Sequence, residues 1–163
     1  MVRSRVAALL TGLAVAATLA TRPPGAHAAA PAATLRPVQI AVIVNTDAPV
    51  VSLTRDDVRR IYLLRTRFWR GGTRIAAANL ASSSPLRDAF SRAVLGQSAH
   101  ELAAYWNDLY FHGTLPPPTV ESEAAMLLYV ARTPGAIGYV TADALTGQSN
   151  GVRVVLSIEG NVP

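Results

Sequence analysis

Three consecutive serines, Ser82, Ser83 and Ser84, stand between a short apolar run and a proline, and this serine turn could bind an anion. The sequence predicts a strand at residues 74–80. It also predicts a helix that begins at Pro85 and has Ser84 as its N-cap residue. A helix N-terminus offers free backbone N–H groups and the positive end of the helix dipole. Serine hydroxyls add donors, so the turn predicts an oxyanion site; the alternative is that the serines only cap the helix.

The elements around the serine turn predict an α/β domain. Residues 38–44 are apolar and β-branched, which is typical of a buried central strand. Further strands are predicted at residues 136–140 and 152–157. Spacing and caps predict helices at residues 54–64, 85–95, 98–112 and 122–132. Because strands and helices alternate, we predict a single three-layer α/β lobe with a mainly parallel sheet.

The beginning of the chain predicts a secretory signal peptide. Arg3 and Arg5 precede the apolar run at residues 6–20, and Ala26-His27-Ala28 matches the small-x-small pattern of a cleavage site. We therefore expect cleavage near Ala28 and a periplasmic or secreted protein. The expected division is a signal peptide at residues 1–28, a flexible lead-in at 29–37 and one domain at 38–163.

Charge and composition exclude some classes of function. Three of the 15 basic residues, Arg3, Arg5 and Arg22, fall in the predicted signal peptide, which leaves 12 against 10 acidic residues. A domain so close to neutral is not expected to bind nucleic acid through bulk charge. The sequence has no cysteine, so neither a disulfide nor a lipid-anchoring cysteine is expected.

Motifs for catalysis and for metal binding are absent from the sequence. The serine turn lacks the G-x-S-x-G pattern of a nucleophile elbow. Asp56 and Asp57 fit helix-start charges better than an acid/base pair. His100 and His112, the histidines beyond the predicted signal peptide, have no ligand-like spacing. We expect no enzymatic activity, no metal site and no cofactor.

Two other features allow two interpretations each. Seven arginines lie between Arg55 and Arg74. They could form a solvated surface or a patch for an acidic partner or anionic lipid headgroups. Four aromatic residues could line a cleft, but their helical spacing favours the core: Trp69, Tyr105, Trp106 and Tyr110.

Three blocks of the sequence resemble the second lobe of phosphate-binding, substrate-binding proteins of ABC transporters. This family lies within the type II periplasmic binding protein superfamily. The blocks are residues 40–45 with Pro49 and Leu53, residues 61–69, and the Pro-Gly-Ala-Ile-Gly-Tyr run at 134–139. The resemblance covers nearly all of the chain after the predicted signal peptide and implies the fold of one lobe.

The resemblance implies a ligand site at the serine turn. In the family this lobe contributes a Ser-Gly-Thr turn at a helix N-terminus and an upstream arginine. Ser82, Ser83 and Ser84 occupy the position of that turn, and Arg87 is the nearest substitute for the arginine. Pro85 departs from the pattern because it lacks an N–H donor.

The implied function is that of an exported, substrate-binding-protein-like domain linked to ABC-type phosphate uptake. The chain resembles a lone second lobe, so we expect weak binding of phosphate or a similar oxyanion. A homodimer or a membrane-protein partner could complete the site. The alternative is a ligand-free periplasmic interaction module that docks to a membrane or sensor protein.

Overall fold

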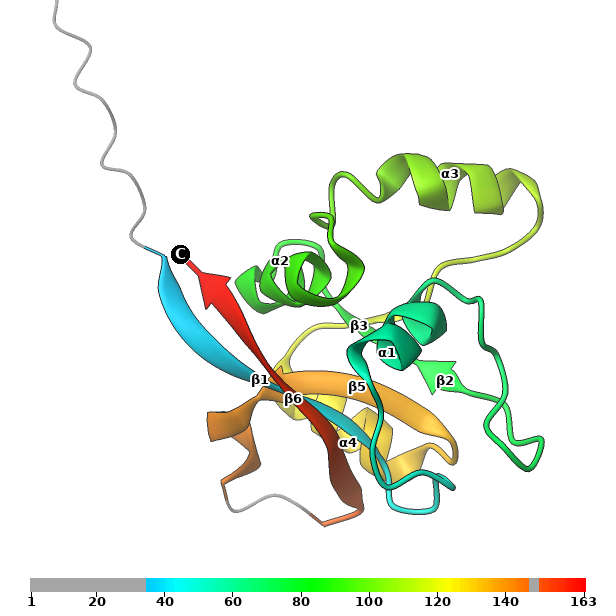
Figure 1. The fold of residues 1–163 in the computed structure, drawn as a ribbon, viewed down its shortest axis with the longest axis vertical. Helices are drawn as coiled ribbons and strands as arrows, with labels where there is room; N and C mark the ends of the chain where they lie inside the picture. Colours follow the sequence, from blue (N-terminus) through cyan, green and yellow to red (C-terminus); the bar gives the residue numbers. More distant parts are fainter. Residues whose placement is uncertain (1–34, 147–149) are drawn as a thin grey trace, which may run out of the picture. The chain divides into compact units, whose positions relative to one another are not determined.

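A four-stranded mixed sheet forms the centre of the described part of the protein (Figure 1). The structure is a computed structural model that describes residues 35–146 and 150–163. The strand order is β2-β5-β1-β6, in which β1 pairs antiparallel with β5 and β6, and β2 pairs parallel with β5. These strands are β1 (Arg36–Asn45), β2 (Ala76–Ala77), β5 (Ala136–Thr141) and β6 (Val152–Val162).

The α/β class is confirmed, but the prediction of a mainly parallel sheet is wrong. Residues 40–44 of β1 are fully buried, as their apolar character predicts. Burial on both faces is typical of strands in parallel sheets. However, burial shows only that a strand is covered and does not determine the direction of the neighbouring strands. Here β5 and β6 flank β1, and the described part of the connection between β5 and β6 contains the short 3₁₀ helix η2 (Ala142–Leu145).

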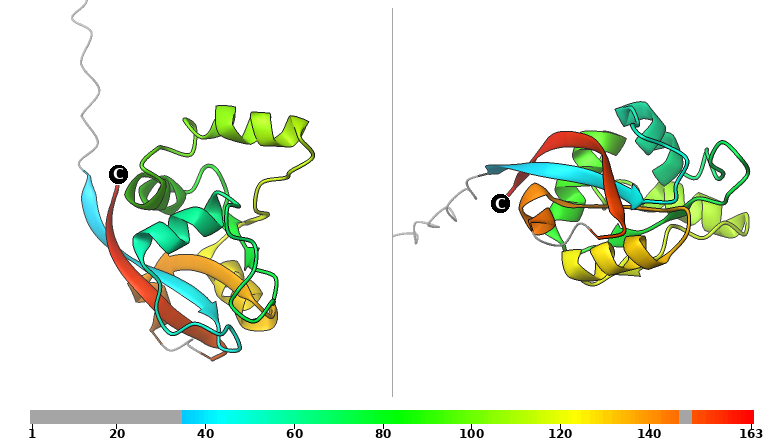
Figure 2. Two further views of the ribbon diagram at one scale, coloured as in Figure 1. Left: turned by 45° about the vertical axis from the view of Figure 1, so that its right-hand side comes forward. Right: turned by 90° about the horizontal axis from the view of Figure 1, so that it is seen from below.

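Helices cover the sheet on two faces, which gives the predicted three layers (Figure 2). On one face, α4 (Glu123–Arg132) packs against β1 and β5. On the other face lie α1 (Arg55–Tyr62) and α2 (Pro85–Phe90). A turn of π-helix, η1 (Ser91–Leu95), continues α2.

Strand β5 packs against both helical layers through adjacent residues. A Cβ atom on Gly138 would overlap with Met126 and Val130 of α4. Tyr139 faces the opposite layer, where its ring stacks on Phe90 of α2 with the ring centroids 3.8 Å apart. The absence of a side chain at Gly138 therefore lets α4 approach the sheet closely, as the sequence predicts.

Three helix ends follow the signals in the sequence, whereas the helix predicted at 98–112 begins only at Ala103. Thr54 and Asp57 form a capping box at the start of α1. The Ser122 hydroxyl accepts the Ala125 N–H at 3.1 Å at the start of α4. Gly96 ends η1 in the left-handed region, with φ of 75°. These contacts satisfy backbone groups that a helix end leaves unpaired, and they confirm the predicted ends.

The predicted strand at 74–80 divides into two short strands that belong to two sheets. The Ala78 N–H still donates to the Ile137 carbonyl of β5, at 3.0 Å. The Asn79 N–H instead donates to the Pro118 carbonyl, at 2.8 Å. From there β3 (Asn79–Leu80) pairs parallel with β4 (Thr119–Val120). This change of partner places the end of β3 beside β4.

The helix α3 (Ala103–Phe111) has no buried residue. Tyr105 and Trp106 are half-buried, and Tyr110 is 61% exposed. Trp69, outside this helix, is 5% exposed and donates from its ring N–H to the Gly135 carbonyl at 2.9 Å. The prediction of core aromatics is therefore confirmed for Trp69 and wrong for Tyr110.

The described residues begin just before β1. Arg36 pairs with Val162, and Pro37 with Asn161, so β1 starts two residues before the expected domain boundary at 38. The predicted signal peptide and most of the predicted lead-in lie outside the described residues. Among the described helices, none has the length and apolar character needed to span a membrane.

Candidate oxyanion site

The serine turn joins the end of β3 to the start of α2, as the sequence predicts. The Ser84 N–H donates to the Ala81 carbonyl at 2.9 Å and closes the turn. The Ser84 carbonyl accepts from the N–H groups of Arg87 and Asp88 at 3.1 and 3.3 Å. Ser84 is therefore the N-cap residue of α2, although its hydroxyl makes no capping hydrogen bond.

The serine turn presents hydrogen-bond donors that have no protein partner. Ser82 and Ser83 are exposed, and Ser84 is half-buried. Within residues 35–146 and 150–163, the three hydroxyls make no hydrogen bond, and the N–H groups of Ser82, Ser83 and Leu86 have no acceptor. Pro85 contributes no donor. Three hydroxyls and three N–H groups around one helix start therefore have no partner among the described residues, and such groups are the donors that an anion at a helix start would use.

Arg87 reaches back from α2 to the end of β3. Its Nη1 atom donates to the Leu80 carbonyl at 2.7 Å, and the residue is half-buried. This bond occupies one donor of the guanidinium and fixes the positive charge beside the strand end. The structure thus brings Arg87 and Ser84 together at one corner, with the arginine held by the backbone and not by the serines.

A buried polar network under the turn was missed from the sequence. The Tyr139 hydroxyl donates to the Asn79 side-chain oxygen and accepts the Leu80 N–H, both at 3.3 Å. Asn79 and Tyr139 are both buried. The signal in the sequence was Asn79 itself, a polar residue in an apolar strand, which needs a partner when buried. The network positions the strand from which the turn starts.

Buried tyrosines beneath the site stay neutral at physiological pH. Burial raises the pKa of Tyr139 well above its usual range, although the Leu80 N–H and the charge of Arg87 partly oppose this shift. Burial also raises the pKa of Tyr62, whose hydroxyl donates to the Ala78 carbonyl at 3.1 Å. Both phenols therefore act as structural hydrogen-bonding groups and not as acids or bases near neutral pH.

Asp88 is an acidic residue in the first turn of α2, and its charge opposes anion binding nearby. Its carboxylate pairs with the Arg92 guanidinium, with the Nε and Oδ2 atoms 2.8 Å apart. This ion pair offsets the negative charge at the helix start. Arg87, whose guanidinium donates to the Leu80 carbonyl at the end of β3, is then the positive side chain fixed beside the serine turn.

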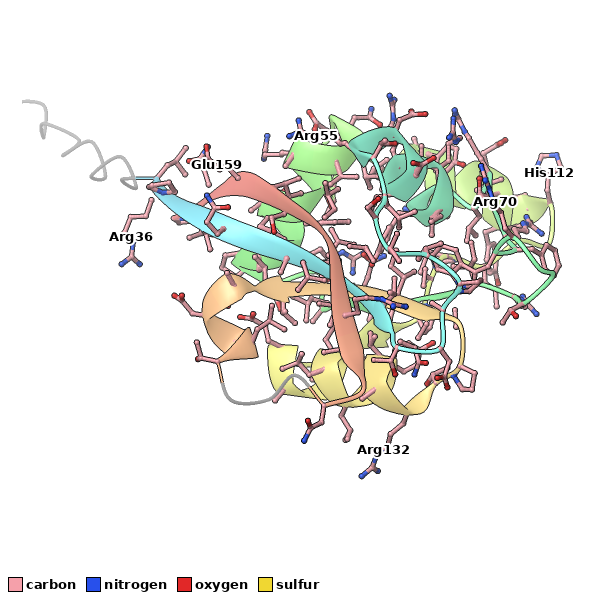
Figure 3. The ribbon with its side chains drawn as sticks, turned by 60° about the horizontal axis from the view of Figure 1, so that its bottom comes forward. Arg36, Arg55, Arg70, His112, Arg132 and Glu159 are labelled. Carbon is pink, nitrogen blue, oxygen red and sulfur yellow. The ribbon has the colours of Figure 1, made fainter. Side chains whose placement is uncertain are left out.

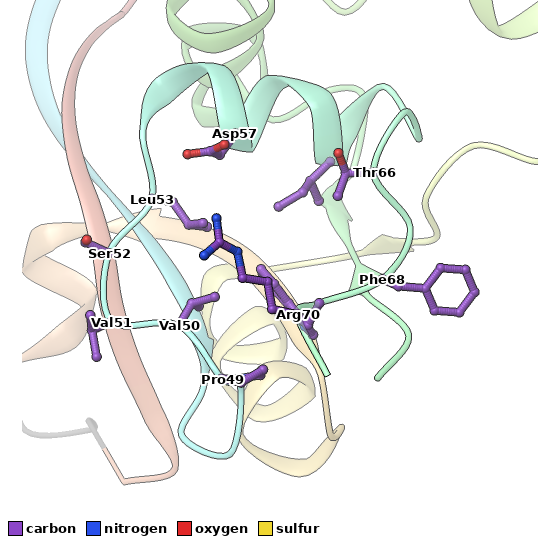
Figure 4. A pocket seen from close by; sticks show the side chains of 11 residues that line it. Pro49, Val50, Val51, Ser52, Leu53, Asp57, Thr66, Phe68 and Arg70 are labelled. Atoms are coloured by element: carbon purple, nitrogen blue, oxygen red, sulfur yellow. The ribbon is translucent and has the colours of Figure 1, made fainter. Parts of the chain in front are cut away.

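Two surface hollows lie away from the serine turn. One cavity of about 380 Å³ is lined by the loop after β1, by α1 and by Trp69 and Arg70 (Figure 4). A wider groove of about 860 Å³ runs along β2 and the segment Leu115 to Thr119. Neither of these two includes a residue of the serine turn among its lining residues. These two hollows are therefore separate from the candidate oxyanion site.

The described residues contain no group of three or more histidine or acidic side chains that could hold a metal ion. His112 has one acidic neighbour in the described structure, Asp108, with the His112 Nδ1 and Asp108 Oδ1 atoms 4.0 Å apart and both side chains exposed. The chemistry that the geometry offers at the serine turn is hydrogen bonding to an anion.

Comparison with solved structures identifies the fold. A phosphate ABC transporter substrate-binding protein from Clostridium perfringens, solved with bound phosphate, matches 78% of this chain with a TM-score of 0.58 and 21% identity. A phosphate transport receptor of the ABC type from Vibrio cholerae matches 76% with a TM-score of 0.55 and 21% identity. PstS from Borrelia burgdorferi matches 74% with a TM-score of 0.58 and 14% identity.

These matches confirm that the chain has the fold of one lobe of such a binding protein. The chain spans 57%, 50% and 47% of the three solved chains, so it corresponds to about half of each. At these identities the likeness establishes the fold. The sequence matches no protein-family model and no curated protein.

Proposed function

We propose that this protein is an exported domain, related to phosphate-binding proteins of ABC transporters, that binds phosphate or a similar oxyanion weakly at the serine turn. The observation that carries the proposal is the set of unpaired donors on Ser82, Ser83 and Leu86, where β3 meets α2. The shared fold supports it, because one of the matched proteins holds phosphate. Ser84 and Arg87 complete the proposed site.

The expected affinity follows from the number and exposure of these donors. Three charge-assisted hydrogen bonds contribute about 1.5–3 kcal/mol each. Association costs about 4–15 kcal/mol in lost freedom before net binding appears. The balance is near zero or slightly favourable, so the turn alone should bind with a Kd of about 1 mM or weaker. A second wall, supplied by another copy or by a membrane protein, would raise the affinity by excluding water.

A thermal-shift experiment with a panel of anions tests which class of ligand the site binds. Phosphate and sulfate should raise the melting temperature in proportion to the logarithm of concentration above the Kd. Acetate should raise the melting temperature less. Its carboxylate has two oxygens that can accept hydrogen bonds, whereas a tetrahedral oxyanion has four. Sodium chloride at matched ionic strength serves as the control for general salt effects.

A pair of serine variants tests the site itself. Ser82→Ala with Ser83→Ala removes two exposed hydroxyls that have no partner in the described structure. Phosphate binding measured by calorimetry should weaken several-fold, whereas the melting temperature without ligand should stay unchanged. Ser157→Ala, at an exposed position on β6, is the matched control and should bind normally. Unchanged phosphate affinity in the double variant would refute the site.

The alternative function is a docking module that retains the lobe and binds no small ligand. Its specific support is that the serine turn is open to solvent and lacks one donor at Pro85. No stabilisation by any oxyanion at tens of millimolar would favour this alternative, because ligands that bind the native state must raise its stability.

Export is a separate part of the proposal and rests on the sequence. Arg3, Arg5, the apolar run at 6–20 and Ala28 have the order of a signal peptide. Mass spectrometry of the protein recovered from the periplasm of an expressing bacterium should find an N-terminus at Ala29. An intact Met1 in a cytoplasmic fraction would contradict export.

A further inference from the structure

The loop between α1 and β2 concentrates positive charge. The sequence has no acidic residue between Asp57 and Asp88, and arginines occur there at 59, 60, 65, 67, 70, 74 and 87. Four of them, Arg65, Arg67, Arg70 and Arg74, lie in the arginine loop, which we define as residues 63–75. All four are exposed.

The nearby carboxylates, Asp56 and Asp57, lie on α1 together with three arginines, Arg55, Arg59 and Arg60. Arg60 pairs with Asp56 and with Asp57, at 2.7 Å in each case. Among the described residues, none of the four arginines of the arginine loop makes an ion pair. The loop therefore carries about four uncompensated charges within a short segment, which creates a local positive potential.

The arginine loop is crossed by hydrogen bonds and has a buried anchor at Trp69. The Trp69 N–H donates to the Thr73 carbonyl at 2.8 Å, and the Ile75 N–H donates to the Arg67 carbonyl at 2.9 Å. The Trp69 ring is buried and bonded to the Gly135 carbonyl. Arg67 also donates from Nε to the Leu64 carbonyl at 3.2 Å. A rigid arrangement lowers the entropy cost of binding a partner.

A cavity lined by both apolar and polar side chains adjoins these charges. The cavity of about 380 Å³ is lined by Val50, Leu53, Ile61 and Trp69 on its apolar side. Its polar lining residues are Ser52, Asp57, Thr66 and Arg70. Figure 4 shows the Arg70 guanidinium extending across the hollow towards the side of Leu53 and Asp57. The volume lies within the range of about 300–1,000 Å³ that is typical of ligand pockets.

Apolar side chains also stand at the rim of the cavity. Val51 is 78% exposed and Phe68 is 58% exposed, and in Figure 4 the Phe68 ring points outward beside the hollow. These exposed groups add apolar area that a bound side chain could cover. The arginine loop and this cavity thus offer both charged and apolar contacts on adjoining surfaces.

We propose that the arginine loop and the adjoining cavity form a docking surface for an acidic protein segment that inserts one apolar side chain. Carboxylates of the segment would pair with Arg67 and Arg70, and its apolar side chain would enter the cavity beside Trp69. The hollow favours a peptide over a membrane, because a lipid surface would meet the arginines but leave a discrete cavity unfilled. This docking surface does not depend on the oxyanion site at the serine turn.

Fluorescence anisotropy with a labelled, glutamate-rich peptide that carries one central phenylalanine tests the docking surface. Arg67→Gln with Arg70→Gln should weaken binding about fivefold, since exposed ion pairs contribute modestly each. Arg70→Gln alone gives a second measurement that leaves the Arg67–Leu64 bond intact, and it should weaken binding about two- to threefold. Replacing the peptide's phenylalanine by alanine should weaken binding independently of any change in the protein.

The matched control removes the same charge elsewhere. Arg36 and Arg132 are exposed, form no ion pair in the described structure, and lie away from Arg70 in Figure 3. Arg36→Gln with Arg132→Gln should change the peptide affinity by less than about twofold. An equal loss in the two double variants would overturn the proposal, as would no peptide binding. Binding to phosphatidylglycerol vesicles that depends on Arg70, without peptide binding, would assign the surface to a membrane instead.

Discussion

The guanidinium of Arg87 and the carbonyl of Leu80 are joined by a 2.7 Å hydrogen bond that spans the serine turn. The two residues belong to consecutive elements, α2 and β3, so the bond fixes the angle at which the helix leaves the strand. It also holds a positive charge at the corner where the unpaired donors of Ser82 and Ser83 lie. The same hydrogen bond therefore contributes to the stability of the fold and to the proposed binding of an anion.

Replacing Arg87 by methionine should affect both properties. The stability should fall by about 1.5 kcal/mol, because a charged hydrogen bond in a half-buried position is lost. Urea unfolding measures this change, and phosphate affinity should fall in the same variant. Arg92→Met, which breaks only an exposed ion pair with Asp88, should leave the midpoint of urea unfolding nearly unchanged. Equal losses in the two variants would contradict the role given to the Arg87–Leu80 bond.

Tyr139→Phe should destabilise the protein while keeping its aromatic packing. The variant leaves the ring stacked on Phe90 but removes the bonds to Asn79 and Leu80. Two buried polar groups then lack partners, which should cost about 1–3 kcal/mol in the free energy of unfolding. The control is Tyr110→Phe, at a residue that is 61% exposed, which should leave the midpoint of urea unfolding unchanged.

Gly138→Ala should destabilise the protein because α4 lies directly against the strand. The added Cβ would meet Met126 and Val130, and overpacking of this kind costs about 1–3 kcal/mol. The cost should shrink in a Met126→Ala background, where the obstructing side chain is gone. A double-mutant cycle measures this coupling. Strict additivity of the two changes would show that the contact does not limit the packing.

Alkaline pH should weaken the fold through Tyr62 and Tyr139. Burial raises the pKa of both phenols above the value of about 10 that tyrosine has in an unfolded chain. Above pH 10 the unfolded state loses these protons while the folded state keeps them, so stability falls as pH rises. The expected slope is about 1.4 kcal/mol per pH unit for each tyrosine. Unfolding measured from pH 8 to 11 should show a shallower decline in Tyr139→Phe.

The local structure was largely predictable because it depends on neighbouring residues. Thr54, Ser122 and Gly96 form the expected ends of helices. Ser84 takes the expected N-cap position even though its hydroxyl is unbonded. Gly138 signalled close packing because close approach of another segment is one of the features that a glycine within a strand often marks.

Long-range relations could not be predicted in the same way. The apolar run in β1 indicated burial, but its antiparallel pairing with β5 and β6 depends on connections that no local pattern specifies. The change of partner between Ala78 and Asn79 depends on where the segment at Pro118 lies, about forty residues later. The bond between Asn79 and Tyr139 likewise joins residues 60 positions apart. The site's donors were predictable, and the network beneath them was not.

A ¹H–¹⁵N NMR titration with phosphate tests the central claim most directly. The account predicts that the amide signals of Ser82, Ser83 and Leu86 move downfield together, with a common Kd of about 1 mM or weaker. Sodium chloride at matched ionic strength should not move them. Shifts confined to the arginine loop, or no shifts at the serine turn at tens of millimolar phosphate, would contradict the oxyanion site.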